Sequence, residues 1–418
     1  MMTPTPSTDD STMRESDPQV AGLLEEERLR QANNLTLIAS ENHCSRAVRQ
    51  ACSSSITDKY AEGYPGARYY GGCEVADKIE NLAISRALDL FEGAEHANVQ
   101  PHSGTTANLA ALQALAETGA GILGMALSAG GHLSHGYPMS HTGKIFTAHH
   151  YGVNPSTGLI ELDEVRKLAL EHKPEIIIAG ASSYPRAIDY AAFAEIAAEV
   201  GAKLLADIAH PAGLIAAGLL PSPIPHADVV TMTTHKTLRG PRGGMILARK
   251  ELAKSINRSL FPGAQGGPLV HQIAGKAVAF GEALAPGFRH YQQAVKDNTS
   301  HLADQLLEMG LDVVTGGTDT HLVLIDLRST SEDITGAEIE ARSLDAGLAI
   351  NKNMVPDDPK PPRVTSGIRL GTAAVSTRGM GTAEMETIAK IIYSLITGED
   401  PGKLRPQIQE LSEAFPLT

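Results

Sequence analysis

Residues 228–244 read Asp-Val-Val-Thr-Met-Thr-Thr-His-Lys-Thr-Leu-Arg-Gly-Pro-Arg-Gly-Gly. The apolar, β-branched run that ends at Thr233 and Thr234 predicts a strand, and the hydroxyls and glycines after it predict a tight loop. Lys236 lies in that loop, just past the strand end. A lysine amine is a Schiff-base nucleophile when burial or crowding by charge keeps it partly neutral. An isolated His-Lys pair more often belongs to an ordinary loop, so the interpretation depends on the rest of the chain.

Short apolar runs alternate with amphipathic helices on both sides of this stretch. Strands are predicted at residues 97–100, 175–179, 203–206 and 228–232, with 244–247 running back, and helices at 106–117 and 190–200. Such repetition favours a mostly parallel sheet with helices on both faces, the α/β class. Further along, a helix at 290–309 and strands at 312–315 and 322–327 indicate a smaller α+β domain.

Length and composition limit the number of domains, the kinds of partner and the cellular setting that can be expected. A chain of 418 residues is longer than one core usually supports, so two domains are expected. The net charge of −13 argues against a nucleic-acid partner or an anionic membrane surface. Cys44, Cys52 and Cys73 lack metal-binding spacing and are too few for a disulfide framework, which favours a cytoplasmic setting. No apolar run approaches the roughly 20 residues that span a bilayer.

The N-terminal region divides into two parts. Residues 1–17 are rich in Ser, Thr, Pro and Asp and lack the features of a signal peptide, so they predict a disordered tail. Residues 18–33 carry Val20, Leu23, Leu24 and Leu29 at helical spacing, which predicts an amphipathic arm helix.

Five polar side chains follow directly after predicted strand ends: Ser103, Ser182, Asp207, His210 and Lys236. Ligands of open α/β sheets bind outside the carboxyl ends of the strands. Simple loop filling is a poor explanation for five such side chains at five such positions, so the sequence predicts a ligand site at this edge.

Two of these positions indicate the kind of ligand. Ser103, Gly104 and Thr105 open a helix, where free N–H groups bind an anion, although a plain helix cap is the simpler alternative. Asp207 ends an apolar strand and needs a cationic partner, such as the pyridinium nitrogen of pyridoxal phosphate. The alternative is that Asp207 caps the next helix.

Two further segments carry side chains suited to binding. His132 and His135 lie among glycines with no carboxylate nearby in the sequence, so we predict no metal and favour stacking on a cofactor ring. Arg369 is suited to a bidentate pair with a substrate carboxylate, with a surface arginine as the alternative.

Taken together, these residues resemble the serine hydroxymethyltransferases, which are pyridoxal-phosphate enzymes of fold type I. The resemblance runs from about residue 18 to 400 and includes long motifs in the family's order, at residues 37–42, 59–66, 68–74, 100–104, 131–132, 234–237, 261–268 and 365–369. It implies a seven-stranded mixed sheet in a large domain. The implied division is a tail at 1–17, an arm with dimer contacts at 18–66, a large cofactor-binding domain at 67–288 and a small domain at 289–418.

The resemblance also implies roles around the cofactor. Lys236 is expected to hold pyridoxal phosphate as an internal aldimine, Asp207 to pair with the ring nitrogen and His132 to stack on the ring. Other expected contacts to the ring hydroxyl and the phosphate come from Ser182, His210, Ser103, Gly104, Thr105 and His235, with Gly266 from a second subunit. Thr233 and Arg242 resemble groups that surround the lysine.

The remaining implied roles concern the substrates. Arg369 and Ser40 would hold the amino-acid carboxylate. Tyr60, Glu62 and Tyr70 resemble groups contributed across a dimer, with Glu62 the acid/base candidate. The folate-contacting positions match Leu127, Gly131, Leu133 and Asn353. A homodimer or a dimer of dimers is expected.

The reaction implied is the interconversion of serine and glycine with tetrahydrofolate, by retro-aldol cleavage through an external aldimine. Departures from the family pattern at Asp58, Thr105-Thr106, Pro211 and His141 leave the acceptor amino acid open. One alternative is therefore a relative that hydroxymethylates alanine to α-methylserine or acts as a threonine-type aldolase. An alternative of another class is a non-catalytic protein that binds the cofactor and a partner.

Overall fold

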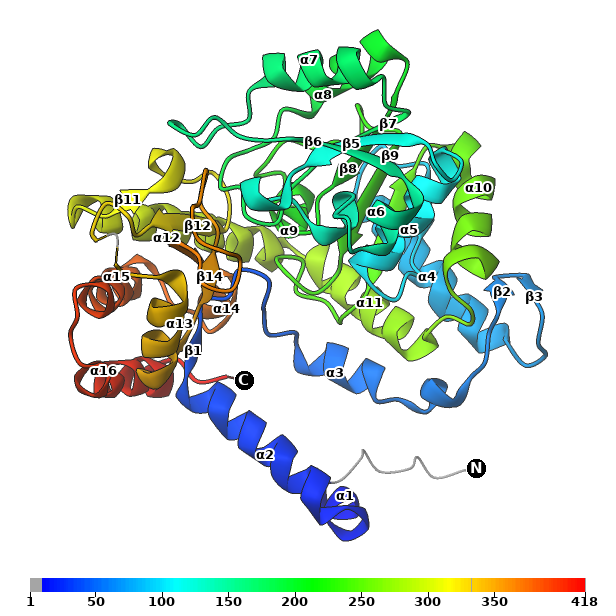
Figure 1. Cartoon of the computed structure of the whole chain (residues 1–418). Coiled ribbons are helices and arrows are strands. Elements are labelled where there is room, and N and C mark those ends of the chain that lie inside the picture. Colours follow the sequence, from blue (N-terminus) through cyan, green and yellow to red (C-terminus); the bar gives the residue numbers. More distant parts are fainter. Residues whose placement is uncertain (1–9, 332, 418) are drawn as a thin grey trace.

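The computed structural model describes residues 10–331 and 333–417. Its centre is a seven-stranded sheet in the order β4-β10-β9-β8-β7-β5-β6 (Figure 1). The strands are β4 (His96–Asn98), β5 (Gly121–Met125), β6 (Thr147–Tyr151), β7 (Ile176–Gly180), β8 (Lys203–Asp207), β9 (Val229–Thr233) and β10 (Gly244–Ala248). β10 runs antiparallel to β4 and β9, whereas β9, β8, β7, β5 and β6 pair in parallel. The predicted mixed, mostly parallel sheet is confirmed.

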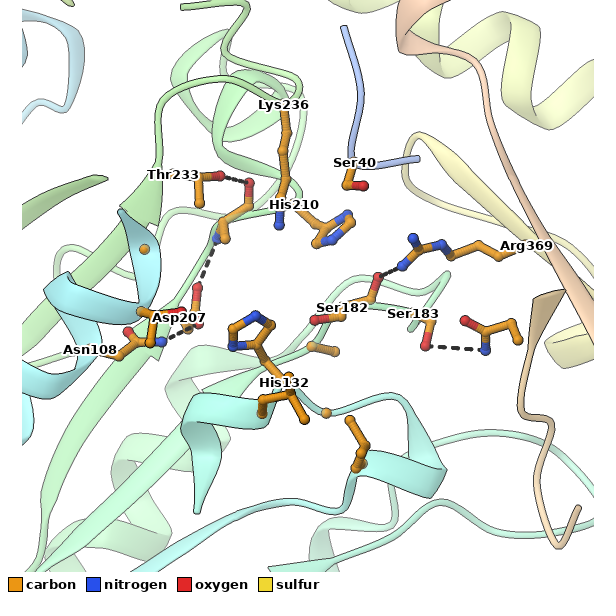
Figure 2. Close-up of a pocket in the computed structure, with 18 of the residues that line it drawn as sticks. Ser40, Asn108, His132, Ser182, Ser183, Asp207, His210, Thr233, Lys236 and Arg369 are labelled. Atoms are coloured by element: carbon orange, nitrogen blue, oxygen red, sulfur yellow. Dashed lines mark hydrogen bonds between the residues drawn. The ribbon is translucent and has the colours of Figure 1, made fainter. Parts of the chain in front are cut away.

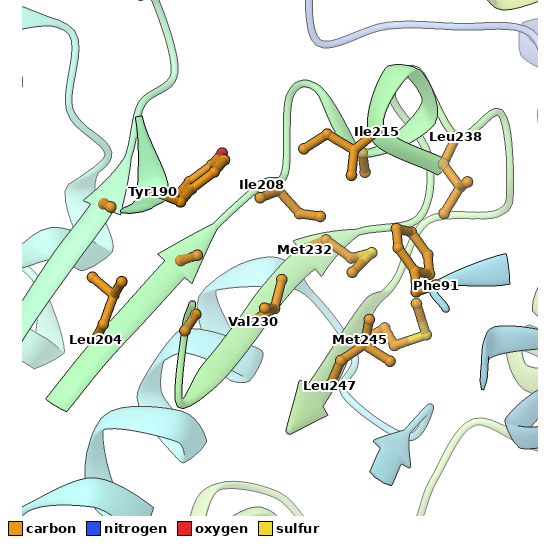
Figure 3. Close-up of a cluster of buried hydrophobic side chains, with 14 of the residues drawn as sticks. Phe91, Tyr190, Leu204, Ile208, Ile215, Val230, Met232, Leu238, Met245 and Leu247 are labelled. Carbon is orange, nitrogen blue, oxygen red and sulfur yellow. The ribbon is translucent and has the colours of Figure 1, made fainter. Parts of the chain in front are cut away.

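Successive residues of the strands alternate between two cores. Leu204, Val230 and Met232 face one core (Figure 3), whereas Leu205 and Val229 face the other. Both faces are thus apolar, as expected for parallel strands covered by helices on both sides. The helices of this part are α3 (Arg46–Cys52), α4 (Glu74–Leu90), α5 (Gly104–Leu115), α6 (His141–Ile145), α7 (Leu162–His172), α8 (Tyr190–Val200), α9 (Ala212–Ala216), α10 (Ala253–Arg258) and α11 (Val270–Ala283).

A second, smaller sheet has the order β11-β12-β15-β14 and is antiparallel. Its strands are β11 (Asp312–Val313), β12 (Leu322–Asp326), β14 (Asn351–Asn353) and β15 (Gly367–Gly371). The helices are α12 (Pro286–Glu308), α13 (Gly336–Asp345), α14 (Ala373–Thr377), α15 (Thr382–Ile396) and α16 (Pro401–Ala414). This part has its own core, to which Leu302, Val323 and Ile388 contribute.

The N-terminal segment packs against this second core. Strand β1 (Leu35–Thr36) pairs in parallel with β13 (Leu348–Ala349), and Leu35 and Leu37 are buried in the smaller core. α12 contributes Phe288 to the large core and Leu302 to the small one. The domain boundaries drawn from the sequence stay a prediction.

The arm helix is confirmed as α2 (Pro18–Asn33), which extends away from the body in Figure 1. Asp17 caps it by accepting hydrogen bonds from the backbone N–H groups of Gln19 and Val20. The tail prediction was wrong for residues 10–16, which form helix α1 (Asp10–Ser16) packed beside α2. A neighbouring helix stabilises such a short one, and composition does not report that contact. Residues 1–9 lie outside the described residues.

Within residues 10–331 and 333–417, none of the helices combines the length and the apolar character that a membrane span requires.

Candidate functional site

A pocket of about 510 Å³ opens at the carboxyl ends of the parallel strands (Figure 2). Its lining residues come both from the part built on the large sheet and from the part built on the small sheet. Most of the predicted site residues line it: Ser40, Ser103, Gly104, Thr105, Leu127, Gly131, His132, Leu133, Ser182, Asp207, His210, Thr233, His235, Lys236, Arg242, Asn353 and Arg369. The structure therefore brings together side chains that are far apart in the sequence.

Lys236 follows β9, and its side chain points into the pocket (Figure 2). It is only 7% exposed. Burial is the main cause that lowers the pKa of its amine to about 8; the charge of Asp207 opposes this effect, and the charges of Arg369 and Arg242 add to it. The Lys236 carbonyl accepts a hydrogen bond from Asn42 Nδ2 at 2.9 Å, which fixes the loop. A fraction of the amine is thus neutral near physiological pH, as a Schiff-base nucleophile requires.

Asp207 ends β8 and is buried at the floor of the pocket. Its Oδ2 accepts hydrogen bonds from Asn108 Nδ2 at 2.8 Å and His135 Nε2 at 2.9 Å, and its Oδ1 accepts one from the Ala209 N–H at 3.0 Å. Burial raises the pKa of the carboxyl, but the hydrogen bond and charge of His135 outweigh burial and hold it well below its usual range. Pro211, not Asp207, occupies the N-cap position of α9, so the capping alternative was wrong.

The histidine loop differs from its sequence-based interpretation in one respect. Asp207 lies with His132 and His135, and the possible ligand atoms of the three residues are within 4.8 Å of one another. The inference that no carboxylate accompanies the two imidazoles was wrong, because β8 supplies one from a distant part of the chain. His135 and Asp207 are hydrogen-bonded to each other. The absence of a metal stays a prediction. Burial lowers the pKa of His132 to about 4, so its ring is neutral.

Sequence reasoning missed Asn108, and it named His135 without predicting that this residue holds Asp207. Asn108 lies inside α5, and its Oδ1 accepts a hydrogen bond from Thr231 Oγ1. His135 ends the short turn that follows His132. Neither residue lies at a strand end, which is why the pattern did not reveal them. A lone asparagine within an alanine-rich helix was the available signal.

Arg369 on β15 lies at the opposite side of the pocket from Asp207 (Figure 2). Its Nη1 donates to the Ser182 carbonyl and its Nη2 to Asn351 Oδ1, both at 2.9 Å. Its buried Nε has no hydrogen-bond partner among the described residues. Burial lowers the pKa of the guanidinium to about 10, so it remains charged. The surface-arginine alternative was wrong, because Arg369 is partly buried and lines the pocket, and a guanidinium with an unpaired N–H fits a carboxylate.

A third end of the pocket is suited to an anion. Ser103 is the N-cap of α5, and its Oγ accepts a hydrogen bond from the Thr106 N–H at 3.1 Å. The cap interpretation and the pocket position are therefore both correct. The first N–H groups of a helix lack partners within it and carry partial positive charge. His235 faces this end; burial and the nearby Arg242 lower its pKa to about 3, so it is a neutral ring.

Four predicted site residues lie in a separate group outside this pocket: Tyr60, Glu62, Tyr70 and Gly266. Tyr60 Oη donates to Glu62 Oε1 at 3.2 Å, and the Tyr60 and Tyr70 rings lie 5.0 Å apart. A Cβ on Gly266 would lie 3.7 Å from Glu62 Oε1. Tyr60 and Tyr70 are about half exposed. We refer to these four residues as the tyrosine cluster.

The pocket therefore has three distinct ends: a buried carboxylate, a helix N-terminus and a partly buried arginine, with a reactive lysine between them. The residues present fit an aldehyde cofactor that carries a ring nitrogen and a phosphate. Arg369 lines its end of the pocket, and its Nε has no hydrogen-bond partner among the described residues, so this end is suited to the carboxylate of a second ligand.

Comparisons with known proteins agree with this chemistry. A family model described as serine hydroxymethyltransferase matches residues 13–392. A curated serine hydroxymethyltransferase from Coprothermobacter proteolyticus is 55% identical over 407 residues, which cover 97% of each chain.

Proposed function

The chain belongs to the serine hydroxymethyltransferase family and interconverts serine and glycine with tetrahydrofolate, and we propose that the reaction takes place in the pocket around Lys236. The observation that carries this assignment is that one pocket contains both a buried lysine of lowered pKa, Lys236, and the buried, charged carboxylate of Asp207. Few other roles explain why both groups line one pocket. The family uses pyridoxal phosphate, and the pocket has the groups to hold it.

The cofactor would lie with its ring nitrogen at Asp207, its phosphate at Ser103, Gly104 and Thr105, and its aldehyde carbon at Lys236. When bound, it supplies an electron-withdrawing ring next to the bond that breaks. Asp207 stays ionised because His135 and Asn108 donate to it, and it thereby favours a protonated ring nitrogen. His132, neutral and partly buried, would stack on the ring face.

The amino acid would be held by its carboxylate at Arg369 and Ser40. This contact orients the side chain of the substrate and keeps its Cα at the reacting centre. Glu62 would move a proton to or from the substrate hydroxyl. Leu127, Gly131, Leu133 and Asn353 also line the pocket and would contact the folate.

We further propose a homodimer in which the tyrosine cluster of one subunit completes the pocket of the other. The cluster lies outside its own chain's pocket, and its tyrosines are about half exposed. The apolar residues Val20, Leu23, Leu24 and Leu29 of the arm helix are also exposed and suit a subunit contact.

The test is an assay of the purified chain with serine and tetrahydrofolate. Glycine and methylenetetrahydrofolate should form in equal amounts, and Lys236→Ala should lose both the visible absorption band of the cofactor and turnover. L-Alanine offered in place of glycine in the reverse direction tests the alternative acceptor. Turnover that does not depend on folate, or full activity of Lys236→Ala, would overturn the proposal.

A further inference from the structure

Lys276 is a buried lysine that the proposed mechanism leaves without a role. It lies on α11 and is 1% exposed. Its Nζ donates to the Val99 carbonyl at 2.6 Å, the Gly244 carbonyl at 2.8 Å and the Pro101 carbonyl at 3.0 Å. All three N–H bonds of an ammonium are thus used, which is the arrangement that makes a buried charge tolerable.

The three carbonyls belong to the two segments that form the anion-binding end of the pocket. Val99 and Pro101 follow β4 and lead directly to Ser103. Gly244 begins β10, two residues after Arg242. The Gly244 N–H donates to the same Pro101 carbonyl at 3.0 Å. One ammonium group therefore ties the two segments together.

Close packing leaves the ammonium little freedom. A Cβ on Gly243 would lie 2.5 Å from Lys276 Cε, and a Cβ on Gly244 would lie 2.3 Å from the Ser103 carbonyl oxygen. Lys276 is therefore packed directly against the backbone at Gly243, and the next residue, Gly244, is packed against the backbone of Ser103. The Thr234 N–H donates to the Gly243 carbonyl at 3.1 Å, and this hydrogen bond joins the segment before His235 to the segment at Gly243.

The surroundings of Lys276 also determine its charge. Burial lowers the pKa of its amine to about 7, while Glu80 on α4 and Cys52 on α3 oppose that effect. Glu80 is itself bonded to Arg68 and Gln100. His102 and His235 lie close enough to Lys276 that its charge lowers the pKa of each ring. A phosphate at the anion-binding end would therefore favour the protonated lysine.

We propose that Lys276 is a positioning residue for the phosphate of the cofactor. Its ammonium holds the carbonyls of Pro101 and Gly244, so that Ser103 and His235 keep their places, and it adds positive charge behind the phosphate. This inference rests on the proposed function, because it takes the phosphate to bind at Ser103, Gly104 and Thr105.

The experiment compares pyridoxal phosphate with pyridoxal, which lacks the phosphate. Affinities are measured by absorbance on the full-length chain depleted of cofactor, for wild type and for Lys276→Gln. The variant should bind pyridoxal phosphate at least about 10-fold more weakly, as expected for the loss of a charged hydrogen-bonding group, yet bind pyridoxal within about threefold of wild type.

Selectivity for the phosphate provides the readout that a purely structural role would leave unchanged. A general loss of packing would weaken pyridoxal phosphate and pyridoxal alike, whereas the loss of a positioning group should weaken only pyridoxal phosphate. An equal loss of affinity for both ligands would overturn the role of Lys276. A wild-type chain that binds both ligands equally would instead overturn the phosphate site itself.

Gly243→Ala is a second variant in case Lys276→Gln does not fold. It keeps the charge but forces Lys276 Cε to move, so it should also weaken pyridoxal phosphate selectively. Gly152→Ala is the matched control, because a Cβ there meets nothing within 4 Å. If Gly243→Ala binds both ligands like wild type, the proposed coupling between Lys276 and the phosphate end is refuted.

Discussion

Lys236 gives the cofactor-free chain a pH-dependent stability. On folding, the pKa of its amine falls from 10.5 to about 8. Below pH 8 the amine is protonated in both the folded and the unfolded chain, so the burial of its charge lowers the free energy of unfolding by the full amount. Between pH 8 and 10.5 the unfolded chain holds more protons, so the contribution of Lys236 to the free energy of unfolding rises with pH.

Lys236→Met should therefore reduce the rise of the free energy of unfolding with pH. Between pH 8.5 and 10 the slope of the free energy of unfolding should be smaller than in wild type by up to about 1.4 kcal/mol per pH unit. Urea unfolding of cofactor-depleted protein across this range measures the slope. Lys390→Met, at an exposed lysine on α15, is the control and should leave it unchanged. Parallel slopes for Lys236→Met and wild type would contradict a buried amine.

Arg369 should determine the affinity for the amino acid. Arg369→Lys keeps a positive charge but cannot form a bidentate pair with a carboxylate. We expect the KM for serine to rise by roughly 10- to 100-fold, the equivalent of about 1.5–3 kcal/mol for a charged hydrogen bond. Steady-state kinetics at saturating folate measure the KM for serine.

Lys352→Gln provides the control for Arg369. Lys352 also lines the pocket, but it pairs with Glu340. Its loss should change the KM for serine by less than about threefold, in line with the small value of exposed or partly exposed pairs. A similar rise in both variants would indicate that general positive charge, and not a specific carboxylate contact, sets the affinity.

The sequence revealed the reactive residues better than the residues that hold them in place. Lys236 and Asp207 follow strand ends, where topology concentrates ligand contacts, and Arg369 was identified by its motif. Asn108 and His135 hold Asp207 from a helix interior and a short turn, positions that no strand-end rule selects. The contact between His135 and Asp207 joins residues far apart in the chain, so only the fold could show it.

At the scale of elements, the N-terminus of α5 is the feature with the clearest consequence. Ser103→Ala removes the hydroxyl that accepts from the Thr106 N–H and should cost about 1 kcal/mol of stability. It should also weaken pyridoxal phosphate relative to pyridoxal, because the hydroxyl lies at the anion-binding end. Chemical denaturation and ligand titration measure the two effects.

Thr335→Ala separates capping from binding. Thr335 caps α13 by accepting from the Glu338 N–H at 3.1 Å and does not line the pocket. It should lose similar stability without any change in the preference for pyridoxal phosphate. If both variants changed that preference equally, the effect of Ser103 would come from stability alone.

The predicted elements were correct where the pattern was strong. The apolar runs of β7, β8 and β9 are buried on both faces and were found from the sequence. Strand β6 was missed because its Thr-Ala-His-His-Tyr sequence is polar, as suits the edge of the sheet. Strand β5 was missed because two of its five residues are glycines, which are unusual within a strand.

At the scale of the whole molecule, the proposed role of Glu62 implies that one chain alone holds an incomplete site. The pocket contains the lysine, the carboxylate and the arginine, yet the acid/base candidate Glu62 lies in the tyrosine cluster outside it. A symmetric dimer repeats each contact twice, so each cluster would serve the opposite pocket. Loss of either Lys236 or Glu62 from both subunits should then remove turnover, with Glu62→Gln costing roughly 10²–10⁴-fold.

Mixed dimers distinguish action across the interface from action within one chain. Lys236→Ala and Glu62→Gln chains, unfolded together at equal concentration and refolded, should form mixed dimers as half of the population. In each mixed dimer one pocket combines an intact Lys236 with an intact Glu62, so roughly a quarter of wild-type activity should return. Refolding each variant alone is the control and should give background activity. If Glu62 served its own chain's pocket, every pocket would lack one of the two groups, and the mixture would stay at background.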